Sequence, residues 1–311
     1  MMIRDFKELA AAAENMTAKS RLALCCAEDE HALEAVAAAV RRGMIDAVLI
    51  GQTDMIEKIL GDLHEDPANY RIIAADGPEE AVRIAADMVR DGEADIIMKG
   101  KMQTSDLMRN VLKKENDLRD SAVLSVCGNF VLKQYPEGYE PRIISVTDPA
   151  LNVHPTLEQK EAILKNALRL RKAMGESDTR VAVIAANEQV SPKIPETVEA
   201  DALKQMNIRG ELEGCTVEGP ISLDLALFPS AAAVKSYESP VAGNADLLLM
   251  PDLISANILA KSITELAGGE TAGIVLGAKV PIVLVSRASA ASDKFNSIAL
   301  AAYVAPKYRK A

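Results

Sequence analysis

Short apolar runs alternate with longer amphipathic stretches along most of this chain, and that alternation restricts the fold more than any other feature. Strand-like runs occur at 21–26, 47–51, 71–75 and 95–99. Between them, apolar residues recur every three or four positions, which is the spacing of a helix that buries one face. Strands that alternate with helices in this way are typical of a parallel, doubly wound sheet. The sequence therefore predicts an α/β fold.

The alternation is interrupted between residues 121 and 148. Two strand-like runs, 122–127 and 142–147, are separated only by a polar loop, which indicates an antiparallel pair. Beyond this point we expect helices at 157–174, 198–206 and 255–266 and strands at 180–186, 215–223, 245–250 and 281–285. We expect two lobes, one made of residues 1–145 and 280–311 and the other of residues 146–279. No internal repeat is evident.

Charge and cysteine content exclude several classes of function. The formal net charge of −10 and the absence of tryptophan argue against a nucleic-acid partner. No uncharged apolar run approaches the ~18 residues of a membrane-spanning helix, and the first residues mix charges rather than form a signal peptide. The four cysteines are scattered without metal-ligand spacing, as expected for free thiols in a reducing cytosol. We expect a cytoplasmic protein without a bound metal.

Side chains that can do chemistry follow the apolar run 281–285. Ser286 and Arg287 come directly after it, and Asp293 lies six residues beyond the arginine. Open α/β sheets bind ligands beyond the carboxyl ends of their strands, and a guanidinium can hold two oxygens of a phosphate or carboxylate. These residues are therefore catalytic candidates. The alternative is an ordinary helix start beside a surface ion pair.

Similar segments follow other predicted strands. A basic segment after 95–99 leads into a helix whose start would favour an anion, although the segment taken alone is better explained as an ordinary solvated helix. Polar loops also follow 142–147 and 245–250. A glycine-rich segment at 268–277 would permit close backbone approach to a ligand or serve as a turn, and no dinucleotide or Walker fingerprint occurs. The binding candidates from these segments are Lys99, Gly100, Thr104, Arg109, Asp148, Asn152, Asp252 and Asn257.

Taken together, these motifs resemble the phosphate acyltransferases that exchange coenzyme A for phosphate, namely the phosphotransacetylases and phosphate butyryltransferases. The resemblance runs from about residue 21 to the C-terminus, and its most specific parts are Ser286-Arg287…Asp293 and Pro251-Asp252…Asn257. It implies two α/β lobes of the isocitrate/isopropylmalate dehydrogenase type, an interlobe cleft for CoA, and a homodimer or larger homo-oligomer. Phosphotransacetylases usually read Ser-Arg-Gly where this chain has alanine at position 288, which favours the butyryl branch.

The resemblance also implies a reaction, in which acyl-CoA and phosphate give acyl phosphate and CoA. CoA is then a substrate and no cofactor is needed. Arg287 would hold phosphoryl oxygens, Ser286 would donate a hydrogen bond to the thiolate or oxyanion, and Asp293 would act as a base. Arg109 resembles an arginine associated with CoA binding.

Two other functions stay open at this point. One is a metal- and NAD-dependent β-decarboxylating dehydrogenase on the same fold, which would need aspartates converging on a divalent ion. Asp224, Asp246 and Asp252 are the candidates for such ligands. The other is a non-catalytic protein that binds CoA without turnover.

Overall fold

A computed structural model describes residues 3–135, 141–285 and 290–308. The chain forms two compact units. Unit 1 comprises Met1–Asp5 and Ala122–Thr271, and unit 2 comprises Phe6–Ser121 and Ala272–Ala311. The boundaries expected from the sequence, at 145 and 279, fall inside unit 1 and unit 2, respectively.

Unit 2 contains a mostly parallel sheet with the strand order β3-β2-β1-β4-β11-β10. Its strands are β1 (Ser20–Cys25), β2 (Ile45–Gly51), β3 (Arg71–Ala74), β4 (Ile96–Lys99), β11 (Ile282–Val283) and β10 (Glu270–Leu276), which enters this unit at Ala272. Only the β10–β11 pair in this order is antiparallel. Successive residues of β1, such as Leu22 and Ala23, are fully buried, because helices cover both faces of the sheet.

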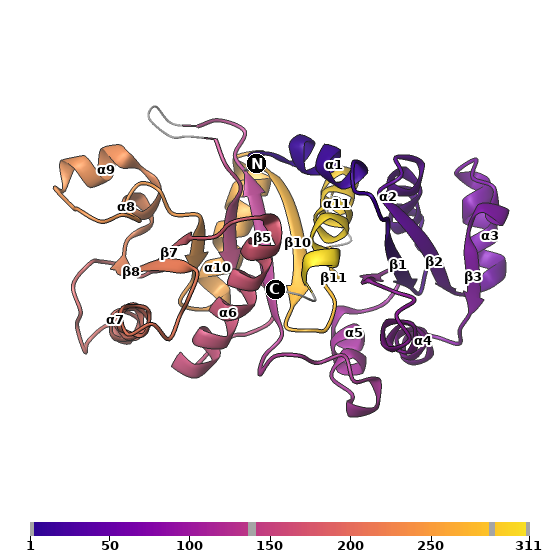
Figure 1. The fold of residues 1–311 in the computed structure, drawn as a ribbon, viewed down its shortest axis with the longest axis horizontal. Helices are drawn as coiled ribbons and strands as arrows, with labels where there is room; N and C mark the ends of the chain where they lie inside the picture. The colour runs from indigo at the N-terminus through magenta and orange to yellow at the C-terminus, as the bar shows by residue number, and fades with distance from the viewer. Residues whose placement is uncertain (1–2, 136–140, 286–289, 309–311) are drawn as a thin grey trace. The chain divides into compact units, whose positions relative to one another are not determined.

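The helices of unit 2 lie on both faces of its sheet (Figure 1). One face carries α1 (Phe6–Glu14), α2 (Glu30–Arg41) and α11 (Ala291–Tyr308), and the other carries α4 (Pro78–Arg90) and α5 (Thr104–Val111). Helix α3 (Thr53–Asp62) and the short helices Pro67–Asn69 and Lys114–Asn116 complete the unit. Asp29 caps α2 by accepting a hydrogen bond from the Ala32 amide at 3.0 Å, so the sheet leads directly into a well-defined helix start.

Unit 1 contains the strand order β5-β6-β9-β7-β8. Its strands are β5 (Ser125–Val131), β6 (Ile144–Thr147), β7 (Thr179–Ile184), β8 (Cys215–Ile221) and β9 (Leu247–Leu249). The predicted antiparallel pair is confirmed, because β5 and β6 run in opposite directions, whereas β6, β9, β7 and β8 are mutually parallel. A division at residue 145 would cut through β6 and separate it from its pairing partner.

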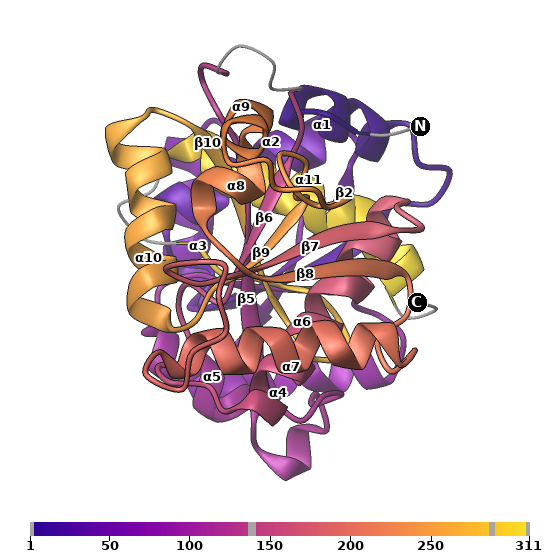
Figure 2. The same ribbon diagram turned by 90° about the vertical axis from the view of Figure 1, so that its left-hand side faces the viewer.

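Helices α6 (Leu157–Met174) and α7 (Pro195–Ile208) lie on one face of this sheet, with α8 (Leu223–Leu227) and α9 (Pro229–Val234) on the other (Figure 2). Helix α10 (Leu253–Lys261) continues into a π-helical turn, Ser262–Leu266. The predicted bounds of α6 are confirmed. Thr156 and Gln159 form a capping box at its start, and Gly175 ends it with a φ of +101°.

The two units repeat one strand arrangement, which the sequence does not reveal. The order β2-β1-β4-β11-β10 corresponds to β8-β7-β9-β6-β5, and each corresponding pair has the same relative direction. Strand β11 of unit 2 and strand β6 of unit 1, each a member of its unit's antiparallel pair, are followed in the chain by a helix of 18 residues. Loops at the ends of β4 and β11 therefore correspond to loops at the ends of β9 and β6.

The sequence left two alternatives open for the glycine-rich segment 268–277, a close backbone approach to a ligand or a turn. The segment is largely strand β10, whose second half is buried. Its apolar residues pair with β11, where Ile274 lies opposite Val283, and Gly273 is accommodated within the strand. The turn glycines at its start obscured a strand that the apolar run Ile-Val-Leu should have indicated.

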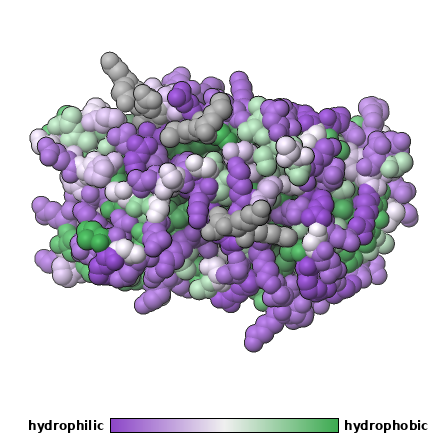
Figure 3. All heavy atoms as spheres, in the orientation of Figure 1, coloured by the Kyte–Doolittle hydropathy of each residue, from purple (hydrophilic) through white to green (hydrophobic). Residues whose placement is uncertain are grey.

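None of the helices in the described ranges is long and apolar enough to cross a membrane. Hydrophilic residues predominate on the face drawn in Figure 3, with smaller hydrophobic areas between them. Apolar side chains are instead concentrated beneath the helices, as in the unit 1 cluster that includes Val146, Ala182 and Leu248.

Candidate active site

A small cavity of about 120 Å³ lies at the carboxyl ends of three unit 2 strands, β1, β4 and β11. This is the edge at which open α/β sheets bind ligands. Two of the predicted binding residues, Lys99 and Gly100, contribute to its wall. The lining residues are Asp29, His31, Ala32, Met98, Lys99, Gly100, Val285 and Lys294.

Lys99 is the last residue of β4, and its ammonium folds back over the following loop. Its Nζ donates to the carbonyls of Gly100 at 3.2 Å and Met102 at 3.1 Å. The same loop is held to the end of β1, because the Gly100 amide donates to the Cys25 carbonyl at 2.9 Å. The position of the lysine is therefore fixed by backbone contacts on both sides.

Gly100 is required by close backbone approach rather than by an unusual φ. A Cβ at this position would lie 2.8 Å from the Cys25 carbonyl oxygen and still closer to that of Cys26. We predict that Gly100→Ala lowers the free energy of unfolding by about 1–3 kcal/mol, because the loop must move off β1. Thermal unfolding measures this change.

Gly61→Ala is the matched control for that substitution. Gly61 is exposed near the end of α3, and a Cβ there would meet no atom within 4 Å. Alanine also has the higher helix propensity, so this variant should be as stable as the wild type or slightly more stable. Equal stabilities for Gly100→Ala and the wild type would contradict the close approach.

Thr104 and Arg109 lie on α5, outside the set of residues that lines the cavity. Thr104 begins this helix, and the preceding Gln103 makes no side-chain cap. The Arg109 guanidinium pairs with Asp106 at 3.0 Å and is 69% exposed. Such an exposed pair contributes little to stability, so Arg109 can turn to a ligand at small cost.

Asp293 lies in the first turn of α11 and is half-buried. Its carbonyl accepts a hydrogen bond from the Ser297 hydroxyl at 2.7 Å, which fixes the backbone of this turn. Ser286 and Arg287 fall outside the described residues, so their convergence with Asp293 stays a prediction. Val285 and Lys294, which are described, both line the cavity.

In unit 1, Asp148 organises the loop that follows β6. Its buried carboxylate accepts hydrogen bonds from the amides of Val126 at 3.0 Å and Asn152 at 3.0 Å, and from the Asn152 side chain at 2.5 Å. The amides of Ala150 and Leu151 add further bonds at 3.1 and 3.2 Å. Burial raises the pKa of Asp148 above its ordinary value, against these hydrogen bonds, which favour the ionised form. The carboxylate is thus engaged by its own loop and by the start of β5.

The loop after the neighbouring strand β9 is joined to the same structure. Asn257 donates from Nδ2 to the Pro149 carbonyl at 3.0 Å, which links α10 to the Asp148 loop. Asp252 caps α10 by accepting from the Ser255 amide at 2.7 Å. The structure therefore brings Asp148, Asn152 and Asn257 together, with Asp252 at the start of the adjoining helix.

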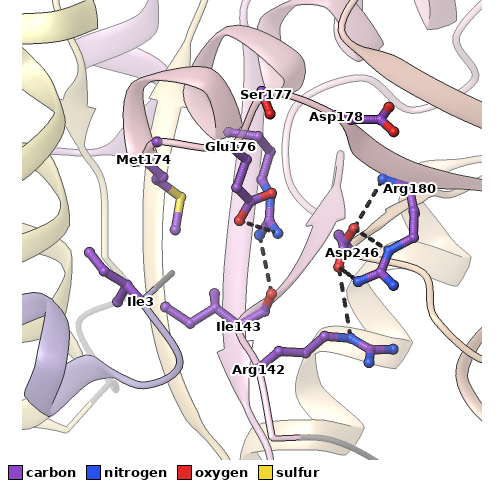
Figure 4. Close-up of a pocket in the computed structure, with 11 residues that line it drawn as sticks. Ile3, Arg142, Ile143, Met174, Glu176, Ser177, Asp178, Arg180 and Asp246 are labelled. Carbon is purple, nitrogen blue, oxygen red and sulfur yellow. Dashed lines mark hydrogen bonds and ion pairs between the residues drawn. The ribbon is translucent and has the colours of Figure 1, made fainter. Parts of the chain in front are cut away.

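A second cavity, of about 410 Å³, lies at the opposite, amino ends of β6, β7 and β9 in unit 1 (Figure 4). Its arginines are matched by acids within the cavity wall. Arg180 forms a two-bond contact with Asp246 at 2.8 and 2.7 Å, and Arg171 pairs with Glu176 at 2.6 Å. Arg142 lies 3.9 Å from Asp246. This balanced network stabilises the unit, and its place is remote from the strand ends that bind ligands.

The three aspartates of the dehydrogenase alternative do not converge. Asp246 directly precedes β9, whereas Asp252 lies beyond its other end, and Asp224 pairs with Lys235 at 3.3 Å. Throughout the described ranges, no group of three or more His, Cys, Asp or Glu side chains is arranged to hold a metal ion. The three aspartates therefore do not support the alternative of a metal-dependent dehydrogenase.

Comparison with known proteins decides the family. A family model described as "Phosphate acetyl/butaryl transferase" matches residues 69–302. The chain belongs to this family. It is 42% identical to a phosphate acetyltransferase from Thermotoga maritima, over 92% of this chain and 95% of the relative. It is also 36% identical to a phosphate butyryltransferase from Clostridium acetobutylicum, over 98% of this chain and 99% of the relative.

The solved structures show which fold this is. A branched-chain phosphotransacylase from Enterococcus faecalis superposes with a TM-score of 0.80 at 26% identity, covering 92% of this chain and 99% of that one. The expected isocitrate/isopropylmalate dehydrogenase type is therefore wrong, and the fold is that of the phosphotransacylases. Each unit is also not purely doubly wound, because β10–β11 and β5–β6 are antiparallel pairs.

Sequence reasoning missed three polar residues of the cavity wall, namely Asp29, His31 and Lys294. The sequence does indicate Asp29 as a helix start after a strand, which the structure confirms, but not as a wall residue. Lys294 directly follows the candidate Asp293, but nothing in the sequence indicates that a lysine there is buried. That information is available only from the packing of α11.

Proposed function

We propose that this protein transfers a short-chain acyl group between CoA and inorganic phosphate. The observation that carries the proposal is the near full-length relationship to phosphate acetyltransferases and phosphate butyryltransferases, together with the family match over residues 69–302. The lysine-lined cavity at the strand ends supports it, because phosphate is an anion. CoA, acyl-CoA, phosphate and acyl phosphate are then the substrates and products, and no further cofactor takes part.

The residues have separate roles in this proposal. Toward acyl phosphate, a phosphate oxygen bonds to the thioester carbonyl carbon, the carbon–sulfur bond breaks, and CoA leaves as a thiolate that takes up a proton. Arg287 holds phosphoryl oxygens, and Ser286 donates to the oxyanion or the thiolate, a contribution typically worth ~10²–10³ in rate. Asp293 returns the proton as an acid, and in the reverse direction it removes the thiol proton as a base.

The loops of unit 1 carry the remaining candidate residues for substrate binding. The side-chain amides of Asn152 and Asn257 donate hydrogen bonds to the carbonyls of Leu124 and Pro149, respectively. The Asp148 carboxylate accepts a hydrogen bond from the Asn152 amide in its own loop. We therefore assign these residues a structural role, in which they fix the shape of the surface that binds the substrate. Asp252 caps the start of α10.

A panel assay tests the function and resolves the acyl group. Release of CoA is followed with a thiol reagent for acetyl-, propionyl-, butyryl- and branched-chain acyl-CoA, each with phosphate. We expect phosphate-dependent release, with butyryl- or acetyl-CoA as the preferred substrate. Tight CoA binding without turnover on any substrate would instead identify a non-catalytic CoA-binding protein. Reduction of NAD by a 2-hydroxy acid would identify a dehydrogenase.

The assembly and location also belong to the proposal. We expect a homodimer or larger homo-oligomer that acts in the cytoplasm, where CoA and phosphate are both present. Light scattering after size-exclusion chromatography measures the molar mass, and a value of 33.3 kDa would show a monomer.

Arg109 is expected to bind the 3′-phosphate of CoA through its exposed guanidinium. We predict that Arg109→Ala raises the KM for CoA about tenfold, the loss of one charged contact, while the KM for dephospho-CoA changes far less. Steady-state kinetics with both thiols measures the difference.

Arg90→Ala is the control, because Arg90 on α4 also pairs with an aspartate one turn away, at 2.7 Å, and is similarly exposed. It should leave both KM values unchanged. Equal losses with the two thiols in Arg109→Ala would place its contact elsewhere on CoA.

A further inference from the structure

Helix α10 lies along one side of unit 1 and carries large apolar side chains that are exposed (Figure 2). Ile254 is 55% exposed and Ile258 is 61% exposed, and the two lie one turn apart on the same face of the helix. Val153 is also 55% exposed, and its carbonyl accepts a hydrogen bond from the Leu253 amide at the start of α10. Large apolar side chains that are grouped on a surface in this way indicate an interaction site.

The core of unit 1 does not account for these isoleucines. Four residues that belong to the buried cluster of unit 1 or pack against it form the inner face of α10, namely Ala256, Leu259, Ala260 and Ile263. They have the spacing by which a helix covers a core with one stripe, and the opposite face of such a helix is normally polar. Here residues 253–260 contain no charged side chain. The outer face of α10 therefore has the composition of a covered surface.

The distribution of charge favours a second copy of this chain as the cover. The formal net charge is −10, so two copies repel each other except where they meet through a surface that is uncharged or carries both signs. Helix α10 meets this condition, because Asp252 caps its start and Lys261 lies in its last turn, on either side of the two isoleucines. A surface with opposite charges on the two sides of an apolar centre is complementary to itself.

A two-fold axis through the middle of the isoleucine pair brings the complementary groups together. With the two helices antiparallel, Ile254 of each copy lies opposite Ile258 of the partner subunit. Because a helix rises ~1.5 Å per residue, Lys261 lies about 7.5 Å beyond this midpoint and Asp252 about 6 Å before it. Lys261 is therefore level with Asp252 of the partner subunit, at both ends of the pair. The antiparallel arrangement also places the basic end of each helix beside the acidic start of the other.

We propose that the α10 face, defined as Ile254, Ile258 and Lys261, is the surface through which two copies of this chain form a two-fold symmetric dimer. The inference rests on the homo-oligomer that the proposed function expects, and it adds the surface and the symmetry. Contact between four isoleucines supplies the apolar attraction, and two Lys261–Asp252 pairs fix the register. A stable interface buries about 800 Å² of each partner, so the surrounding surface of unit 1, beginning with Val153, completes the contact.

The test is Ile258→Lys, with the molar mass measured by light scattering over a range of protein concentrations. The wild type should have twice the 33.3 kDa of one chain. The substitution should raise the dissociation constant of the dimer at least about 100-fold, because each interface then contains two ammonium groups in place of apolar contact. Ile208→Lys is the matched control, since Ile208 ends α7 of the same unit and is 67% exposed. It should keep the mass of the wild type.

A second pair of variants tests the antiparallel register. Lys261→Glu places two acids at each end of the helix pair, so it should raise the dissociation constant about tenfold. Lys172→Glu is its control, because Lys172 is an exposed lysine in the last turn of α6 in the same unit. A melting curve checks that each variant is folded. Should Ile258→Lys not fold, Ile254→Lys changes the opposing side chain and should dissociate the dimer to the same extent.

The outcomes separate this inference from the proposed function. A wild-type monomer would overturn the inference together with the expected oligomer, while the acyl-transfer assay would still decide the reaction. A dimer that persists in the folded isoleucine variants would overturn the inference alone, because the copies would then meet through another surface. A Lys261→Glu dimer as stable as the wild type would overturn the antiparallel pairing.

Discussion

Replacing Asp293 by asparagine is expected to lower turnover by at least about 100-fold while the affinity for CoA stays nearly unchanged. In the direction that consumes acyl phosphate, the CoA thiol must lose a proton before it attacks. A thiol with a pKa of about 8.5 and an aspartate with a pKa of about 3.9 differ by ~4.6 units, roughly 6 kcal/mol uphill. Asp293 can therefore act as the base only if desolvation raises its affinity for a proton or if proton transfer is concerted with attack, and either makes the surroundings of the base decisive.

The fold should survive this change, because Asp293 lies in the first turn of α11, where its backbone is held by Ser297. Asp54→Asn is the control, since Asp54 is an exposed aspartate in the first turn of α3. Like Asp293→Asn, this variant removes a negative charge near a helix start, which lowers the free energy of unfolding by only ~0.3–1 kcal/mol. Kinetics in both directions and a melting curve are measured on each preparation. A folded Asp293→Asn enzyme with wild-type turnover would remove Asp293 from the mechanism.

Most strands could be predicted from the sequence because burial on both faces produces continuous apolar runs. The run at 47–51 and the strand Ile45–Gly51 illustrate this agreement. Two elements show its limits. Glycines at the start of β10 resemble a turn, and β11 retains only Ile282–Val283 of the expected 281–285. The repeat between the units was not visible, because it consists of strand order and contacts rather than similar residues.

The candidate site was predictable in place but less so in detail. Polar residues after strands mark the ligand edge of any parallel sheet, and Lys99 and Gly100 lie in such a cavity. Their partners depend on contacts distant in sequence. Asp148 accepts from the Val126 amide, 22 residues away, and Gly100 packs on Cys25. No local pattern encodes such contacts, so the sequence could nominate Asp148 without indicating that its own loop engages it.

A second large effect is expected at Asp246, which is buried at the amino end of β9. Its carboxylate accepts from the amide, Nε and Nη2 of Arg180 at 3.0, 2.8 and 2.7 Å (Figure 4). Asp246→Ala leaves the charge of Arg180, and of the nearby buried Arg142, without this partner. Removing one member of a fully buried ion pair typically costs ~3–5 kcal/mol, and because the Arg180 side chain is 33% exposed we expect a loss toward the lower end of that range in the free energy of unfolding. Chemical denaturation measures it.

The repeat between the units supplies a closely matched control. Asp95 accepts from the amide, Nε and Nη2 of Arg21 at 3.0, 2.8 and 2.9 Å, in the corresponding position before β4. The side chains of Asp95 and Arg21 are 21% and 41% exposed, those of Asp246 and Arg180 are 9% and 33% exposed, and only Asp246 also lies beside the buried Arg142. Water can therefore replace the lost contact at Arg21, and Asp95→Ala should cost about 1 kcal/mol.

The dependence on pH distinguishes an ion pair from simple packing. Burial opposes ionisation of Asp246, but the hydrogen bond from Arg180 and the charges of Arg171 and Arg180 outweigh it and hold its pKa below the ordinary value. Because the folded pKa is lowered, the stabilisation is complete above the unfolded pKa of about 3.9 and is lost as the pH falls through the folded value. The stability gap between wild type and Asp246→Asn should therefore be constant near neutral pH and narrow in acid. If the difference in unfolding free energy between wild type and Asp246→Asn stays constant below pH ~3, Asp246 acts through its shape and not through its charge. If Asp95→Ala and Asp246→Ala lose the same unfolding free energy, burial does not set the strength of this repeated contact.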